Sequence, residues 1–489
     1  MRVVYFDLDC IRADHLGCYG YQRETSPNID AVARNAVRFN RCYTSDAPCV
    51  PSRAALFSGR FGFNNGVVGN VDTPIQYPPF PNRRVRDREM PMVMRHLRAN
   101  GVRPISFSNF ADRHDAWWYH SGWDEHHLIN LRRGFETCDE VNAVALPWFE
   151  QHGAEDDYFV HVHYWDNHFP YRSPDMPEWM ERFADEPAPE WPDEETIADQ
   201  HENWYGARTA RDLWGIGGQD ADRFPWMPAE IRTREDYKKL IDGYDATIYQ
   251  VDHYIGQILD VLEKQDVLDD TVIIIGGDHG DCFGENGIYM DHYTASEPVL
   301  HRPLIVRWPG VTRESTCGEL LYLLDLAPTL CDMYGIEKPP LWDGESFIDA
   351  LRGGDFEGRH YLVCEQSIAT VQQAVRTRHH LFVRTLFPGI YPIDEPCWLY
   401  DTDGDPYTTN NLADEHPELV ERYDHLLEQW KHEQFRKHGP HPDPLDELAE
   451  RMAGQDISRW LEHFRSTGRE RHAEDLIERM EQYRPGFRG

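Results

Sequence analysis

Lysine is scarce in this chain. Only six of its 49 Lys and Arg residues are lysines, the first of them is Lys238, and 85 Asp and Glu residues leave a formal net charge of −36. Nucleic-acid backbones and anionic bilayers require a substantial positive face on their protein partner, so this charge excludes both as the main partner. It does not exclude a local basic pocket that binds a small anion.

Long apolar runs and a disulfide pattern are also absent. Runs such as 320–324 are far shorter than the roughly 20 apolar residues that cross a bilayer. The N-terminus reaches Asp7 and Asp9 before a signal-peptide core could form, and the ten cysteines contain no Cys-x-x-Cys pair, which suits a reducing compartment. We therefore expect a cytoplasmic protein without a membrane span.

What is present indicates a large folded α/β protein. The composition is 40% hydrophobic and 12% aromatic, which is typical of a globular chain. Residues 3–6 and the Ile-rich stretch 271–275 read as buried strands that lead into acidic residues, and apolar spacing predicts a long amphipathic helix over 236–264. A helix that leads into a buried strand favours a sheet with helices on both faces.

Composition divides the chain into two predicted domains, 1–352 and 353–489. Segment 174–236 has little periodicity and reads as a variable surface insertion near the mouth of an active site. Short apolar runs after residue 353 predict an antiparallel sheet in a smaller C-terminal α+β domain. From Pro442 onward the pattern is amphipathic helix, which either packs on the body or forms a homo-oligomer contact.

The first acidic cluster follows the first strand. The two-residue period of a strand puts Asp7 and Asp9 on the same side, where two carboxylates can hold a divalent metal. The string also resembles the first motif of haloacid-dehalogenase-type phosphatases, in which Asp7 would be the nucleophile. Those enzymes usually continue with a tight Gly-Thr turn, whereas Cys10 follows here.

The second cluster begins at Cys49 and continues Val-Pro-Ser-Arg53 into an apolar helix that ends in Ser-Gly. Pro51 and Ser52 suit a first helical turn, so Cys49 lies near a helix N-terminus, where backbone N–H groups favour an anion. The string resembles the signature of the formylglycine-dependent sulfatases, members of the alkaline phosphatase superfamily, in which the cysteine is converted to formylglycine.

Other motifs extend this resemblance over most of the chain, in the family's order. They are the stretches 9–20, 25–30, 324–330, 342–346, 399–401 and 411–412. The resemblance implies an alkaline-phosphatase-like mixed sheet flanked by helices, with a smaller C-terminal domain. It also implies a formylglycine-generating or maturase enzyme as a partner.

The third cluster, Gly-Gly-Asp278-His279-Gly, follows the Ile-rich strand. Carboxylate oxygen and imidazole nitrogen are ligands for a divalent ion. By resemblance, Asp278 and His279 complete a metal site with Asp9 and the modified Cys49. Cys10 stands where the family often has a second Asp, and the Asp, Asp, His pattern is similar to the phosphonate monoester hydrolase branch, so Ca²⁺, Mn²⁺ and Mg²⁺ all stay open.

A sulfate ester resists attack because its oxygens carry negative charge, so hydrolysis needs charge neutralisation, a strong oxygen nucleophile and protonation of the leaving alcohol. The aldehyde hydrate of modified Cys49 would attack sulfur. Arg53, one helical turn on, would hold that hydrate, and His168 resembles the family histidine that contacts the ester oxygen.

The lysine shortage removes the two substrate-binding lysines that typical sulfatases carry. Their places fall near Asn109, with His114 close by, and near His292. Histidines in these places would make the charge of the anion pocket titratable.

The sequence therefore predicts a hydrolase of small sulfate esters, arylsulfatase-like in chemistry. The alternative within the same fold is a phosphonate monoester or phosphodiester hydrolase, because both chemistries use the same metal, hydrate and arginine. A relative that only binds sulfated glycans is the non-enzymatic alternative.

Overall fold

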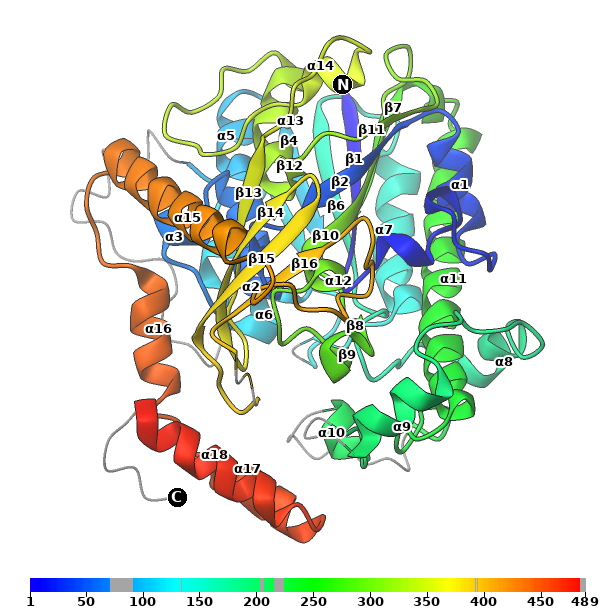
Figure 1. The fold of residues 1–489 in the computed structure, drawn as a ribbon. Coiled ribbons are helices and arrows are strands. Elements are labelled where there is room, and N and C mark those ends of the chain that lie inside the picture. The colour runs from blue at the N-terminus through cyan, green and yellow to red at the C-terminus, as the bar shows by residue number, and fades with distance from the viewer. Residues whose placement is uncertain are drawn as a thin grey trace.

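The computed structural model describes residues 1–70, 91–132, 134–202, 206–214, 224–391, 393 and 395–483. Two large sheets organise these residues, and β8 and β9 form a third sheet of two strands (Figure 1). The larger has the strand order β11-β2-β10-β7-β1-β6-β4-β5, with β12 beside β2, and the smaller has the order β16-β15-β14-β13-β3. The predicted mixed α/β sheet with a smaller C-terminal sheet is confirmed.

The strands have the following bounds: β1 Arg2–Leu8, β2 Val37–Tyr43, β3 Asp46–Ala47, β4 Arg103–Phe107, β5 Glu125–His127, β6 Tyr158–Tyr164, β7 Thr271–Gly277, β8 Cys282–Phe283, β9 Tyr289–Asp291, β10 His301–Arg307, β11 Ser315–Cys317, β12 Leu321–Tyr322, β13 Tyr361–Gln366, β14 Val371–Thr377, β15 His380–Phe387 and β16 Cys397–Asp401.

The helices have the following bounds: α1 Pro27–Ala33, α2 Cys49–Ser58, α3 Gly62–Asn65, α5 Val93–Ala99, α6 Phe110–His114, α7 Cys138–His152, α8 Met176–Glu181, α9 Glu194–Glu202, α10 Ala210–Trp214, α11 Arg234–Lys264, α12 Glu297–Leu300, α13 Leu326–Tyr334, α14 Ile348–Leu351, α15 Pro417–His438, α16 Pro444–Met452, α17 Ser458–Ser466 and α18 Glu470–Tyr483.

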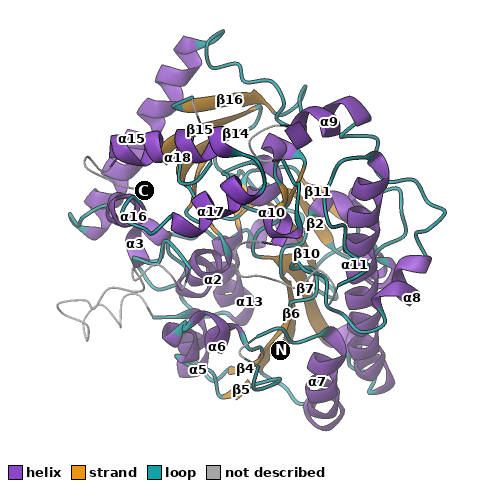
Figure 2. Ribbon diagram, turned by 90° about the horizontal axis from the view of Figure 1, so that it is seen from below, coloured by secondary structure: helices purple, strands orange, loops and turns teal. Residues whose placement is uncertain are grey.

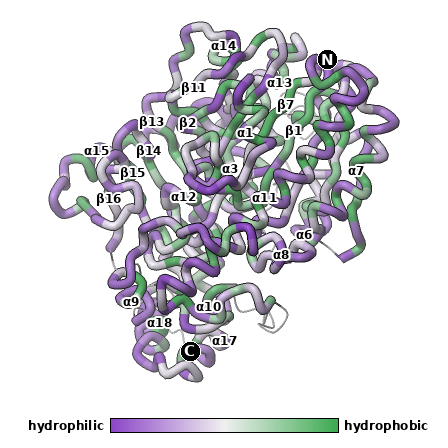
Figure 3. The backbone as a smooth tube through the Cα atoms, turned by 90° about the vertical axis from the view of Figure 1, so that its right-hand side faces the viewer, coloured by the Kyte–Doolittle hydropathy of each residue, from purple (hydrophilic) through white to green (hydrophobic). Residues whose placement is uncertain are grey.

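Strand β1 shows how the larger sheet is covered on both faces. Val4 and Phe6 belong to the apolar cluster that includes α7 and α11, whereas Val3 and Tyr5 belong to the cluster that includes α2, α5 and α13. Successive side chains of a strand point to opposite faces, so the odd-numbered residues of β1 face α2. In Figure 3 the hydrophobic colour follows the buried strands of this sheet.

The long helix that the spacing predicts is α11, and it starts two residues earlier than expected. Thr233 and Asp236 form a capping box, in which the Thr233 side chain accepts from the Asp236 amide and the Asp236 carboxylate accepts from the Thr233 amide. These bonds satisfy N–H and carboxylate groups at the helix start, so the helix begins there.

The smaller sheet is not built from the C-terminal part alone. Strand β3 pairs in parallel with β13, through Glu365 opposite Asp46 and Gln366 opposite Ala47. The segment that leads into Cys49 is therefore hydrogen-bonded to the C-terminal sheet. The boundary at 352/353 stays a prediction.

The C-terminal tail packs within the chain. Its apolar side chains, predicted from the spacing, are buried together with Val68, Val371 and Phe387; they are Leu445, Leu448, Met452, Ile457, Leu461 and Phe464. The tail also meets the insertion, because Asp212 Oδ1 on α10 accepts from His463 Nε2 at 2.9 Å and from Arg469 Nη2 at 2.8 Å. Figure 2 shows α17 beside α10. The tail's apolar face is thus already covered, and the homo-oligomer contact stays a prediction.

The predicted insertion, 174–236, holds three short helices, α8 to α10, among its described residues. Helices this short contribute little periodicity, which explains the irregular sequence pattern. None of the helices in the described ranges combines the length and the apolar character needed to cross a membrane.

Candidate functional site

Two parallel strands bring the predicted acidic residues to one edge of the sheet. In the β1–β7 pair, Asp7 lies opposite Gly276 and Leu8 opposite Gly277, so Asp9 and Asp278 leave the sheet side by side. The backbone N–H of Cys10, the residue after Asp9, donates to Asp278 Oδ1 at 3.2 Å. The strand register therefore joins two clusters that are 269 residues apart in sequence.

Helix α2 supplies the third component. Its first turn is fixed to the Asp278 loop, because Ser52 Oγ donates to the carbonyl oxygen of Asp278 at 2.8 Å and Thr44 Oγ1 donates to Ser52 Oγ at 2.9 Å. Cys49 is the first residue of the helix and is 1% exposed. Its Sγ lies 3.0 Å from His279 Nε2. The predicted nucleophile position and the predicted metal ligands therefore meet.

Arg53 binds three carboxylates at the base of this site. Its Nε donates to Asp7 Oδ2 at 2.7 Å, and its Nη1 lies 2.5 Å from Asp278 Oδ2 and 3.0 Å from Asp9 Oδ2. Arg53 is one helical turn after Cys49, as the spacing predicted. Its guanidinium holds the three carboxylates in place. Its single positive charge does not balance them, so buried negative charge remains in excess.

The donor set fits a divalent cation. One ligand atom each from Asp9, Cys49, Asp278 and His279 lies within 4.8 Å of the others, and all four residues are buried. Burial raises the pKa of Asp278 to about 8, although Arg53 opposes this shift. Three carboxylates that share one guanidinium are short of positive charge, and a dication would supply it.

Asp7 and Cys49, the two candidate nucleophiles that the sequence left open, lie in different surroundings. The Asp7 carboxylate, considered as a phosphatase nucleophile, is 1% exposed and is held by Arg53 and by His161 Nε2 at 3.1 Å. Burial, followed by the charges of Asp9 and Asp278, raises the pKa of the Cys49 thiol well above its usual range. Asp7 is therefore a partner of Arg53, and unmodified Cys49 is a poor thiolate nucleophile.

His168 lies at the edge of the same centre. Ligand atoms of Asp9, Cys10 and His168 lie within 4.8 Å of one another, and the His168 ring stacks on Trp165 with centroids 5.3 Å apart. Its Nδ1 lies 2.7 Å from the carbonyl oxygen of Phe169 and donates to it, which leaves Nε2 as the available nitrogen. Burial, followed by the charge of Arg113, lowers the pKa of His168 to about 3.

The Asn109 side chain forms hydrogen bonds with residues 129 and 130. Its Nδ2 donates to the carbonyl oxygen and to Oδ1 of Asn130 at 3.0 and 2.9 Å, and its Oδ1 accepts from the Ile129 amide at 2.8 Å. Both ends of the side-chain amide are thus used to hold the 129–130 loop. The substrate-binding role expected from the sequence stays a prediction.

Arg113, one residue before the predicted His114, is the cation that the sequence reasoning did not select. Burial, followed by the charge of Arg113, lowers the pKa of His114 well below its usual range, so His114 is neutral. The Arg113 guanidinium lies over the Trp165 ring at 4.2 Å and the Phe135 ring at 4.4 Å. It forms no ion pair with any carboxylate in the described part of the chain, and its buried Nη1 has no hydrogen-bond partner there.

The charge of Arg113 acts on Cys49, Asp9 and His168. A buried cation without a carboxylate partner, close to the nucleophile position, is suited to an anionic ligand. The sequence offered one indication of this role for Arg113. The residue lies in the stretch from Ser106 to His114, which lacks the expected lysine.

His292 is where the sequence predicted a positive charge. Its Nδ1 lies 2.8 Å from Asp281 Oδ1 and 3.7 Å from Asp291 Oδ1. Burial alone would lower the pKa of His292, but the hydrogen bond and charge of Asp281 raise it to about 9. Its ring centroid is 4.2 Å from that of His279, so its charge lies beside the metal ligands.

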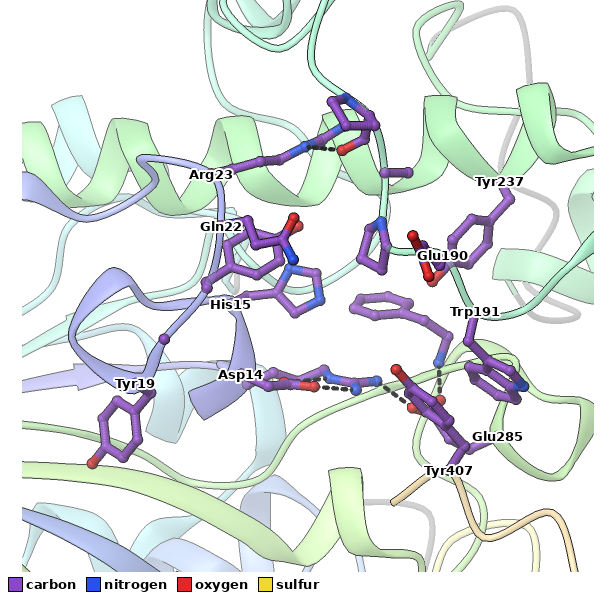
Figure 4. A pocket seen from close by; sticks show the side chains of 17 residues that line it. Asp14, His15, Tyr19, Gln22, Arg23, Glu190, Trp191, Tyr237, Glu285 and Tyr407 are labelled. Atoms are coloured by element: carbon purple, nitrogen blue, oxygen red, sulfur yellow. Dashed lines mark hydrogen bonds and ion pairs between the residues drawn. The ribbon is translucent and has the colours of Figure 1, made fainter. Parts of the chain in front are cut away.

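A cavity of about 420 Å³ is lined in part by Phe283 and Glu285, which follow the predicted metal ligands Asp278 and His279 in sequence. Its wall includes Arg12, whose Nη1 donates to the Asp281 carbonyl oxygen at 3.1 Å. Figure 4 shows Trp191 and Tyr407 at one end of the cavity and Tyr19 at the other. None of the catalytic, metal or substrate-binding residues predicted above lines this cavity, whereas part of the predicted insertion, 187–191, does.

The fold and the site together suit a hydrolase built on an α/β sheet, with the predicted nucleophile position at a helix N-terminus and a carboxylate–histidine cluster at the strand ends. Comparison with known proteins identifies the family. The profile described as Sulfatase matches residues 2–336, and that described as N-sulphoglucosamine sulphohydrolase, C-terminal, matches residues 284–435. The chain belongs to the sulfatase family, and the predicted hydrolase class and superfamily are confirmed.

Individual relatives are distant but cover most of the chain. The N-acetylglucosamine-6-O-sulfatase of Bacteroides thetaiotaomicron is 24% identical over 88% of this chain and 87% of its own length. The choline-sulfatase of Rhizobium meliloti is 25% identical over 80% and 78%.

Solved structures share the fold. One, titled as a complex with its substrate D-glucosamine-2-N,6-O-disulfate, has a TM-score of 0.70 at 19% identity and covers 91% of this chain and 99% of its own. The phosphonate monoester hydrolase of Agrobacterium radiobacter has a TM-score of 0.68 at 20% identity, with 88% and 96% covered.

Proposed function

We propose that this sulfatase cleaves the sulfate monoester of an organic alcohol and uses formylglycine made from Cys49. The observation that carries the proposal is the position of Cys49, the first residue of α2, with its Sγ 3.0 Å from His279 Nε2 and with Asp9 and Asp278 in the same ligand group. The hydrated aldehyde supplies an oxygen nucleophile that an unmodified, protonated thiol lacks.

Asp9, Asp278 and His279 would hold one divalent cation, which supplies charge neutralisation for an ester whose oxygens are negative. The imidazole donor favours Mn²⁺ over Ca²⁺, because Ca²⁺ prefers oxygen ligands. Mg²⁺ is the third candidate. Arg53 keeps Asp9 and Asp278 in position through its contacts at 3.0 and 2.5 Å.

Positive charge around the leaving group would come from the guanidinium of Arg113 and from the protonated ring of His292. The available Nε2 of His168 would accept a proton from the nucleophile and return it to the leaving oxygen, since the ring is neutral before the reaction. His168 thereby acts as a shuttle, and its general-acid function depends on that first proton transfer.

Maturation of Cys49 would require a formylglycine-generating or maturase enzyme. Peptide mass spectrometry of protein from its native host should show the Cys49 peptide lighter than the unmodified sequence, and Cys49→Ala should abolish aryl sulfate hydrolysis. Cys331→Ala, a buried cysteine on α13, is the matched control and should retain activity. An unmodified thiol in active native protein would refute the mechanism.

Phosphonate monoester or phosphodiester hydrolysis is the second candidate. It is favoured by His279 as the nitrogen ligand and by the fold shared with phosphonate monoester hydrolases. Comparing kcat/KM for an aryl sulfate, a phosphonate monoester and a phosphodiester decides between them. A clear preference for either phosphorus substrate would replace sulfate as the proposed substrate.

A further inference from the structure

The cavity of about 420 Å³ has no part in the mechanism proposed above, and we call it the aromatic cavity. Its wall combines rings and carboxylates from separate parts of the chain. They are Asp14, His15, Tyr19 and Tyr21 near the N-terminus, Glu190 and Trp191 in the insertion, Tyr237 on α11, Phe283 and Glu285 in and after β8, and Tyr407 after β16. A cavity of this volume accommodates a small organic molecule.

The carboxylates of the wall outnumber the positive charge available to them. Arg12 serves two of them, because its Nη2 lies 2.7 Å from Asp14 Oδ2 and its Nη1 lies 2.9 Å from Glu285 Oε1. The third carboxylate of the wall, Glu190, forms no ion pair with any residue that the structure describes. One guanidinium therefore faces three carboxylates in this part of the wall.

The other arginines nearby do not change this balance. Arg23 also lines the cavity, but it pairs with Asp242 at 2.9 Å and with Asp245 at 2.8 Å, neither of which does. The guanidinium of Arg234 lies over the Tyr237 ring at 5.1 Å, is not part of the wall, and donates to two proline carbonyl oxygens. The wall is therefore anionic, and an anion is not its matching ligand.

The negative charge acts on the end of the cavity that Trp191 and Tyr407 form. Their rings stack with centroids 4.3 Å apart and an interplanar angle of 10°. Burial, followed by the charges of Asp14 and Glu285, raises the pKa of Tyr407, and Glu190 acts in the same direction although the nearby arginine opposes them. Carboxylates beside aromatic rings suit an organic cation, since the ring faces attract it as well.

Two buried polar groups of the wall have unused hydrogen-bonding capacity (Figure 4). Tyr237 is 3% exposed, and its hydroxyl bonds to no residue in the described ranges. His15 is also 3% exposed; its Nδ1 lies 2.7 Å from Asp245 Oδ1, whereas its Nε2 bonds to none of those residues. With Nδ1 donating to the carboxylate, Nε2 of the neutral ring is an acceptor. A ligand that donates N–H groups would satisfy such acceptors.

We propose that the aromatic cavity binds a protonated organic amine whose body is an apolar ring. The ammonium group is balanced by the surplus carboxylate charge of Asp14, Glu190 and Glu285, and its N–H groups serve the acceptors of the wall. The ring packs against Phe283 and the stacked Trp191 and Tyr407. The cavity thus takes a cation, whereas the centre at Cys49 takes an anion.

Two probes of the same shape test the proposal on the full chain without any turnover. Benzylamine is an ammonium ion at neutral pH, and benzyl alcohol is its uncharged counterpart. Saturation-transfer difference NMR gives a Kd for each. Hydrogen bonds to a charged group should make benzylamine bind about 10-fold or more tightly. Equal affinity for both probes, or tighter binding of benzyl alcohol, would overturn the proposal.

Two matched pairs of variants locate the bound amine. Tyr237→Phe removes one hydroxyl from the wall and should weaken benzylamine about 2- to 12-fold, whereas Tyr254→Phe, on the same helix but outside the wall, should leave the Kd unchanged. Glu190→Gln should weaken it up to about 5-fold, as for an exposed ion pair, and Glu195→Gln on α9 should not. An unchanged Kd in both wall variants would overturn the proposal. Equal weakening by the two glutamate variants would also overturn it, because the amine would then follow only the acidity of the whole chain.

Discussion

Arg113 offers the sharpest test of how this chain binds an anion without the usual lysines. Replacing it with methionine keeps much of the side-chain volume over the Trp165 and Phe135 rings and removes the charge. A hydrogen bond to a charged group contributes about 1.5–3 kcal/mol. At 1.36 kcal/mol per factor of ten, kcat/KM for an aryl sulfate should fall roughly 10- to 150-fold.

Stability separates this role from a structural one. Arg113 has no carboxylate partner among the described residues, so its removal leaves no buried carboxylate behind and the melting temperature should stay level or rise. Arg359→Met is the matched comparison, because Arg359 Nη2 donates to buried Asp325 Oδ1 at 2.8 Å. Breaking that pair should cost about 3–5 kcal/mol of unfolding free energy.

Steady-state kinetics on both variants, with thermal unfolding monitored by circular dichroism, gives the two readouts. Arg113→Lys should recover part of the loss, because the charge returns without the planar fork. Parent-level kcat/KM in a folded Arg113→Met protein would refute the anion-binding role. A large loss of stability in that variant would instead show that Arg113 supports the fold.

Three further predictions concern the pairs that hold the site and the tail. Asp343 Oδ1 accepts from His438 Nε2 at 2.6 Å and from Lys437 Nζ at 2.8 Å. Burial opposes ionisation of the Asp343 carboxyl, but His438 and Lys437 hold the pKa of Asp343 well below its usual range. Its stabilisation is therefore present above the unfolded pKa of about 3.9 and is lost as pH falls below it. Urea unfolding should show Asp343→Asn about 3–5 kcal/mol less stable at pH 7, with a smaller difference at pH 3; an equal difference at both would contradict the pairing. Asp7→Asn should lower the melting temperature and leave measurable aryl sulfate hydrolysis, since Asp7 supports Arg53, and complete inactivity in a folded protein would contradict that role. Asp212→Ala should expose the 440–483 tail to limited proteolysis, because His463 and Arg469 lose their shared carboxylate; cleavage at the parent rate would show that apolar packing alone holds the tail.

Short-range chemistry in the sequence predicted the residues that the structure brings together around Cys49. A buried strand that ends in Asp9, a helix start at Cys49 with Arg53 one turn on, and an Ile-rich strand that ends in Asp278 and His279 are local patterns, and their side-chain directions follow from the periods of strand and helix. The same local reasoning predicted α11, the antiparallel runs after residue 353 and the amphipathic tail. Strand β3 escaped it, because a two-residue strand has no period to detect.

Only the tertiary structure decided which charges face the site. Asn109 and Arg113 stand in one short stretch, and the sequence could not show that the first holds the 129–130 loop while the second lies over Trp165 near Cys49. Likewise, Cys10, Asp281 and His292 are separated by up to 282 positions, and the β1–β7 register together with the β8–β9 hairpin brings them together. The physical reason is that sequence spacing fixes the direction of a side chain within its own element, whereas the pairing of elements determines which buried charges are left without a partner.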